Sequence, residues 1–200
     1  MLGGMRTAFK EWAIVVDALG RGEQIMILRK GGISEGRCGF MMEHDEFFLF
    51  PSLFHQQRDC VTAAAQRRFD EIAPNLPSAA EVRIEYFAKV VEWRKLESLS
   101  DARSLKGEHI WTDQVIAERF EWGSEQGIFA LAVRVYRLAR PFVAAMLPQY
   151  GGCKSWLKLD ADIGTEGAVS VLTDAGFAQK LEKLRVCLHS QDGVNLLSRT

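Results

Sequence analysis

The stretch that decides the fold is TAFKEWAIVVDALGRGEQIMILRKGG, residues 7–32. Apolar side chains recur in its first half at the spacing of one helical face: Phe9, Trp12, Val16 and Leu19. Gly20 follows them as a helix stop, and residues 23–28 predict a buried strand that ends at a pair of glycines. Residues 13–19 also fit a strand, because they include a β-branched run, but the spacing favours a helix.

Beyond this stretch, the chain mixes strands and helices. Apolar strands are predicted at residues 46–51 and 127–141, and alternation of polar and apolar residues predicts a half-buried strand at residues 81–93. A helix is predicted at residues 109–122, with Thr112 as its N-cap. No regular strand–helix–strand rhythm is present. The sequence therefore predicts an α+β fold with a mostly antiparallel sheet or small β-barrel and flanking helices.

The domain organisation follows from one Pro-rich break. Residues 1–160 are interpreted as a single α+β domain with a helical insertion at residues 53–80. The insertion ends in PNLPSAA, residues 74–80, which is typical of a linker. Residues 161–200 are expected to form a C-terminal loop, a helix and a tail.

Composition narrows the class of protein. Hydrophobic residues make up 48% of the 200, which is enough for a sizeable core. The net charge of −1 provides no overall positive field, so any nucleic-acid surface must be a local patch. The four cysteines form no C-x-x-C pair, and no apolar run approaches the ~20 residues of a membrane span. We expect a reduced, cytoplasmic protein that does not associate with membranes.

Several blocks of the sequence resemble known families. FKEWAIVVDALGRGEQIMILRKGGISEG, FFLFPSLFHQ, HIWT, RVYRLARP and YGGCKSW resemble a bacterial family known as a domain of unknown function. ALGRGEQIMILRKG, HIWTDQVIAERF and RLARP followed by YGGCKSW are also distantly similar to ASCH and EVE domains of the PUA-like fold. This second resemblance implies a small β-barrel that holds RNA, modified bases or nucleotides in a cleft.

The chain differs from one group of ASCH proteins at two positions. Some small ASCH proteins resemble amidohydrolases that use a lysine and a threonine around the first strand. The corresponding positions here are Gln24 and Ile27, and neither side chain can act as a general base or nucleophile. The arginine of the pattern is present as Arg29, so the resemblance implies binding at this strand but not that activity.

Polar side chains gather around this strand and the sequence that follows it. We interpret seven residues as a ligand-binding cleft: Arg29, Lys30, Glu43, His44, His55, Gln56 and Trp111. Arginine suits a phosphate or a guanine edge, glutamate accepts from an exocyclic amine, and tryptophan stacks on a base. A solvated loop and a core tryptophan explain the same residues without a ligand. The leading hypothesis is a binding module for RNA, DNA or a modified nucleotide, with no cofactor and no established catalysis.

A metal-dependent nuclease or hydrolase is the second hypothesis. Carboxylates and imidazoles bind divalent metals, and the segment EHDE places several of them together. The expected ligands are His44, Asp45 and His55, with Glu43 beside them. The strand carries no acid two residues before Lys30, which a nuclease of the restriction type requires.

A protein-interaction or regulatory subunit is the third hypothesis. It predicts a large exposed apolar patch on the C-terminal helix, around Phe177, Leu181 and Leu184.

Overall fold

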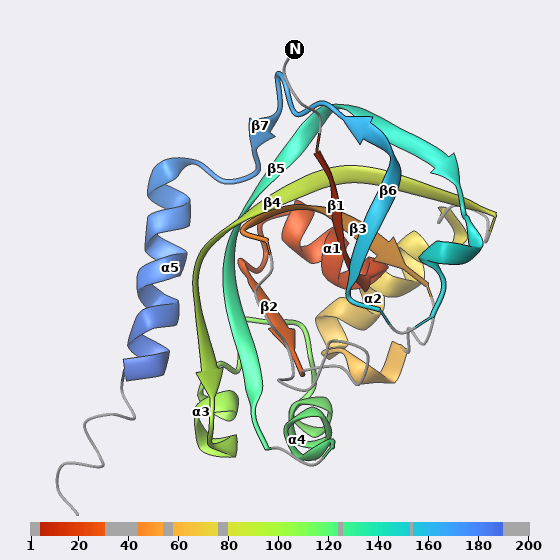
Figure 1. Cartoon of the computed structure of the whole chain (residues 1–200). Helices are drawn as coiled ribbons and strands as arrows, with labels where there is room; N and C mark the ends of the chain where they lie inside the picture. The colour runs from red at the N-terminus through yellow and green to blue at the C-terminus, as the bar shows by residue number, and fades with distance from the viewer. Residues whose placement is uncertain are drawn as a thin grey trace, which may run out of the picture.

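The computed structural model of the chain describes residues 5–30, 44–53, 58–75, 80–123, 126–152 and 154–189. These residues form a seven-stranded sheet and five α-helices (Figure 1). The strands are β1 (Met5–Trp12), β2 (Met26–Arg29), β3 (Glu46–Ser52), β4 (Glu81–Leu96), β5 (Ile128–Ala145), β6 (Trp156–Ile163) and β7 (Val169–Ser170). The helices are α1 (Ala13–Gly20), α2 (Ala63–Ile72), α3 (Leu99–Ser104), α4 (Asp113–Glu121) and α5 (Asp174–His189). Short 3-10 helices lie at Arg58–Cys60, Ala73–Asn75 and Pro148–Tyr150.

The strands follow the order β2-β5-β4-β3-β1-β6, and β7 pairs with β5. β1 and β3 run parallel, and the other pairings are antiparallel. The α+β class is confirmed. Within the described ranges no hydrogen-bonded pairing joins β2 to β6, the two ends of the order, so the sheet is not closed. The closed barrel predicted from the sequence is therefore not confirmed.

The two longest strands give the sheet its bend. β4 and β5 pair along almost their full length, and their register shifts between Ile84 and Tyr86 and again between Val90 and Glu92. Such bulges bend and twist a strand, and both strands curve across the molecule in Figure 1.

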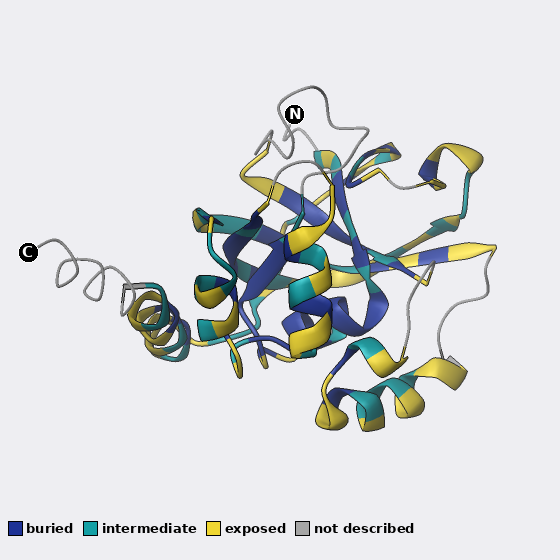
Figure 2. Cartoon of the chain, turned by 90° about the horizontal axis from the view of Figure 1, so that it is seen from below, coloured by how far each residue is buried: buried dark blue, intermediate teal, exposed yellow. Residues whose placement is uncertain are grey.

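The sheet is buried on both faces around β3. Successive strand residues point to opposite faces of the sheet, and β3 carries apolar side chains on both faces. Phe47 and Leu49 belong to one hydrophobic cluster, which includes residues of α1, α4 and α5. Phe48 and Phe50 belong to a second cluster, built from β6 and the outer ends of β4 and β5. Figure 2 shows buried strands at the centre and exposed outer faces on the helices.

The start of the chain differs from the sequence prediction. Phe9 and Trp12 were predicted on a helix, but residues 5–12 form β1 and α1 begins at Ala13. The helical spacing arose because a strand runs directly into a helix at Trp12, whose backbone is extended (φ −59°, ψ 139°). The alternative of a strand at residues 13–19 is also wrong, since these residues lie in α1.

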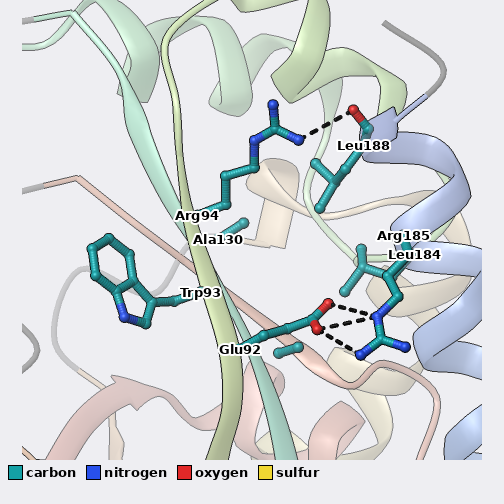
Figure 3. Close-up of a pocket in the computed structure, with 8 residues that line it drawn as sticks. Glu92, Trp93, Arg94, Ala130, Leu184, Arg185 and Leu188 are labelled. Atoms are coloured by element: carbon teal, nitrogen blue, oxygen red, sulfur yellow. Dashed lines mark hydrogen bonds and ion pairs between the residues drawn. The ribbon is translucent and has the colours of Figure 1, made fainter. Parts of the chain in front are cut away.

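The C-terminal helix packs on the sheet. Phe177, Leu181 and Leu184 are 6%, 8% and 2% exposed, so the predicted exposed apolar patch at these residues is wrong. Figure 3 shows Arg185 of α5 directed at Glu92 of β4, with Nη2 and Oε2 2.8 Å apart. Among the helices of the described ranges, none is long and apolar enough to cross a membrane.

Candidate ligand-binding site

The site lies between β2 and β6, the two ends of the strand order. Arg29 ends β2, and Ser155 immediately precedes β6. Arg29 Nη2 donates a hydrogen bond to Ser155 Oγ at 2.5 Å. A side chain thus bridges β2 and β6, which no described backbone pairing joins. We call this region the seam site and define it as Glu11, Arg29, Arg119, Ser155 and Trp156.

Glu11 places a buried carboxylate at the seam. It shares the inner face of β1 with Phe9, two residues earlier, and is 2% exposed. Glu11 Oε1 accepts a hydrogen bond from the Trp12 backbone N–H at 2.8 Å, and Oε2 lies 4.0 Å from Arg29 Nη1. Glu11 Oε2 and Arg29 Nε are buried and, within the described part of the chain, have no hydrogen-bond partner. Buried polar atoms are usually paired, so this is a place for a water or a ligand group.

Arg119 brings a second cation from α4. Its guanidinium carbon lies 3.9 Å from the centroid of the Trp111 ring and 5.7 Å from that of Trp12. Burial lowers the pKa of Arg119 to about 10; the negative charge of Glu11 opposes this shift, and the positive charge of Arg29 adds to it. The carboxylate of Glu11 and the guanidinium groups of Arg29 and Arg119 are therefore close enough to act on one another.

Aromatic rings line the same region. The guanidinium carbon of Arg29 lies 5.0 Å from the ring centroid of Phe9, and Phe9 contacts Trp156 edge-on at 4.8 Å. His44 also contacts Trp156 edge-on, at 5.3 Å. Trp156 is only partly buried and His44 is exposed, so aromatic surface reaches solvent beside Arg29.

Comparison with known families assigns the chain to one of them. The sequence model of DUF1802, a domain of unknown function, matches residues 8–183. The chain belongs to the DUF1802 family. The membership in a family of unknown function that the sequence blocks indicated is thus confirmed, and no curated protein matches this DUF1802 chain.

Solved structures of ASCH proteins from Zymomonas mobilis are similar to the DUF1802 chain. ASCH itself is 11% identical, with a TM-score of 0.41, over 89% of this chain and 94% of that one. A tyrosine-to-phenylalanine mutant protein is 12% identical, with a TM-score of 0.43, over 89% and 96%. A serine-to-alanine mutant protein is 13% identical, with a TM-score of 0.41, over 89% and 94%.

The structure of the DUF1802 chain brings some of the predicted site residues together. Arg29 lies in the seam site, and His44 contacts it through Trp156. Lys30 points elsewhere, as expected for adjacent strand residues, and its Nζ donates to the backbone carbonyl of Phe120 at 2.8 Å. Glu43, His55 and Gln56 lie outside the described residues.

Trp111 has a different role from the one predicted. It is 2% exposed, and Arg119 covers its ring, so Arg119 occupies the position that a stacked base was expected to take on that face. Trp12 contacts Trp111 edge-on at 4.8 Å. Trp111 therefore supports Arg119 from within the core.

Gln24 and Ile27, which replace the lysine and threonine of the amidohydrolase pattern, are structural in the DUF1802 chain. Gln24 Nε2 donates to the Met26 carbonyl at 2.7 Å, and its Oε1 accepts from the Ile110 N–H at 3.1 Å. Ile27 is fully buried in the core.

The metal hypothesis gains no support from the described residues. Within these ranges no group of three or more His, Cys, Asp and Glu side chains is placed to hold a metal ion. His44 and Asp45 are described, and both are exposed.

Sequence reasoning missed four residues of the seam site: Glu11, Arg119, Ser155 and Trp156. Glu11 was missed because the stretch from Phe9 to Leu19 was interpreted as one helix; alternation with Phe9 in a strand would have placed Glu11 inside. Arg119 was taken for part of an ordinary helix. Ser155 precedes β6 and Trp156 begins it, and the sequence carries no local signal that β6 approaches β2.

Proposed function

We propose that the chain binds single-stranded nucleic acid or a modified nucleotide at the seam site. The observation that supports this most strongly is the setting of Arg29. Its side chain is 21% exposed, and it is held between the buried Ser155 and Glu11 where β2 and β6 come together. A guanidinium held in this way offers directed donors to a phosphate or to the edge of a base.

Exposed aromatic surface near Arg29 supports a base rather than phosphate alone. Trp156 and His44 provide one such surface. Trp93 provides another: it is 53% exposed, and its ring lies 5.9 Å from that of Phe129. Phe129 of β5 is the strand partner of Arg29. The register of β5 with β4 places Trp93 on the same face of the sheet as Phe129 and Arg29. Base faces are free to stack on such rings in single strands and free nucleotides, and are covered in duplexes.

In this proposal, Glu11 balances the charge of Arg29 and holds its side chain in position. Its buried carboxylate compensates the charge of both arginines and keeps the Arg29 side chain in place. The net charge of the chain is −1, so phosphate attraction is confined to the seam site and involves few contacts. The salt dependence of binding should then be shallow, with a slope of about −0.7 per phosphate contact on a single strand.

Fluorescence anisotropy with labelled single-stranded and duplex RNA and DNA, at about 50 and about 200 mM salt, tests the proposal. Single strands should bind in the micromolar range, and Arg29→Ala should weaken binding about tenfold, the value of one charge-assisted hydrogen bond. Arg185→Ala is the matched control, because Arg185 is a half-exposed arginine paired with Glu92 on the far side of β4. Equal binding by wild type and Arg29→Ala, or no binding to any of the four, would contradict the proposal.

A further inference from the structure

A cleft of about 970 Å³ lies away from the seam site, between α1, α2 and the outer ends of β3, β4 and β5. Lys10 of β1 lines it, whereas the next residue, Glu11, points to the seam. Adjacent strand residues face opposite sides of a sheet, so the cleft and the seam site lie on opposite faces of β1. A volume of this size is typical of pockets for small molecules.

The floor of the cleft is apolar. Phe50, Val82 and Tyr150 line it, and their exposed fractions are 1%, 2% and 4%. Lys10 fixes the wall at Tyr150: its Nζ donates to the backbone carbonyls of Tyr150 at 2.5 Å and Gly152 at 2.9 Å. The ring contact of Phe50 with Tyr150, at 5.6 Å, joins floor and wall.

Charged side chains surround this floor, and most of the arginines have carboxylate partners. Arg68 and Arg21 both pair with Asp17, at 2.8 and 3.1 Å. Arg83 pairs with Glu85. These ion pairs leave little net charge for a ligand at that part of the rim.

Arg137 differs from these three arginines. It is exposed and, within the described residues, has no carboxylate at ion-pair distance. Its Nη2 lies 3.4 Å from Tyr86 Oη, and its guanidinium carbon lies 5.6 Å from the centroid of the Tyr86 ring. Tyr86 itself packs against Gly20, where an added Cβ would lie 2.4 Å from the ring. The rim therefore presents a cation next to a fixed aromatic surface.

We propose that this cleft binds a small organic anion, with its carboxylate, phosphate or sulfonate on Arg137 and its apolar body on the floor beside Tyr86. Arginine recognises such anions through paired donors, and the buried floor gains from covering an apolar group. Glu81 also lines the cleft, but it lies five residues along β4 from Tyr86, about 16 Å at strand spacing, so it does not repel an anion at Arg137. This proposal does not depend on the seam site.

Titration with 8-anilinonaphthalene-1-sulfonate, an aromatic sulfonate whose fluorescence rises in apolar surroundings, tests the cleft. Wild type should bind it saturably, and Arg137→Ala should weaken binding about tenfold. Arg140→Ala is the matched control: Arg140 is exposed on the same strand, three residues on, and does not line the cleft. Arg29→Ala, a change at the seam site, should bind the dye as wild type does.

Competition identifies the body of the ligand. Displacement of the dye by laurate indicates an aliphatic anion, and displacement by phenyl phosphate indicates an aromatic one. Thermal unfolding of each variant checks that it is folded. Equal dye affinity in wild type, Arg137→Ala and Arg140→Ala, no saturable dye binding by wild type, or no displacement by either competitor would overturn the proposal.

Discussion

At the scale of residues, Glu11 is the group on which the seam site depends. It is 2% exposed and is the carboxylate that acts on both Arg29 and Arg119. A buried charge without compensation is costly, so the two arginines need this carboxylate to remain in place.

Glu11→Gln should therefore destabilise the protein, because it keeps the shape of the side chain and removes its charge. We expect a loss of about 1–2 kcal/mol in the free energy of unfolding, measured by urea denaturation. Asp162→Asn is the control: it breaks the exposed pair with Arg6 and should leave stability almost unchanged. An equal effect of the two substitutions would show that Glu11 does not compensate buried charge.

His109 gives the protein a pH dependence. It is 7% exposed, its Nδ1 accepts from the Trp111 N–H at 3.2 Å, and burial lowers its pKa from 6.5 to about 4. The unfolded state then binds the proton more readily than the folded state. The contribution of His109 to stability is complete above pH 6.5 and is lost as pH falls from 6.5 toward 4.

Urea unfolding at two pH values measures this contribution. Wild type should lose about 2 kcal/mol between about pH 7 and about pH 5 through His109. His109→Asn keeps an acceptor for the Trp111 N–H and cannot titrate, so its stability should fall less over this interval. An unchanged pH dependence in His109→Asn would mean that other groups are responsible.

At the scale of elements, α4 carries Arg119 to the seam. Its N-cap is Thr112, whose hydroxyl accepts from the Val115 N–H at 3.4 Å. Thr112→Ala should cost about 1 kcal/mol in the free energy of unfolding and also weaken oligonucleotide binding, because Thr112 joins Trp111 to the start of α4, the helix that carries Arg119. Ser98→Ala removes the N-cap of α3, where Ser98 Oγ accepts from the Asp101 N–H at 3.0 Å, and should cost a similar amount without changing binding. Identical binding by both variants would argue against a role of α4 in the site.

Two substitutions in α5 test whether the apolar face of this helix is part of the core. Leu184 is 2% exposed against the sheet, so Leu184→Ala should cost about 3 kcal/mol through lost burial and a cavity. Val186 on the same helix is 55% exposed, and Val186→Ala should have little effect. A small loss in Leu184→Ala would mean that this face is not part of the core, as the interaction-subunit hypothesis assumed.

At the scale of the whole molecule, local patterns predicted the α+β class, but they also predicted a barrel, whereas the sheet of the described residues is not closed. Alternation at residues 81–93 and the Thr112 cap were found because a strand and a helix cap are local features. β1 was missed because the spacing of Phe9 and Trp12 matches a helix when the strand-to-helix junction is overlooked. The position of β2 and β6 at the two ends of the sheet depends on strand order, which these patterns do not contain.

Only the part of the candidate site that a single residue indicates, Arg29, was predictable from the sequence. Arg29 stood out as an arginine at the end of a buried strand, and the structure places it in the seam site. Glu11, Ser155 and Trp156 join it through the bend of the sheet, over separations of up to 127 positions in the chain, from Arg29 to Trp156. The cleft at Arg137 and Tyr86 was not predicted, since its residues look like ordinary strand residues.

The most direct test of the central claim is to follow the indole N–H signals of the tryptophans by NMR during titration with a single-stranded oligonucleotide. If the seam site binds it, the Trp156 signal shifts and saturates, and Arg29→Ala abolishes the shift at the same concentration. The signal of Trp122, which is 66% exposed beyond the end of α4, stays in place. A Trp156 signal that does not move at saturation, or a shift confined to Trp122, would contradict binding at the seam.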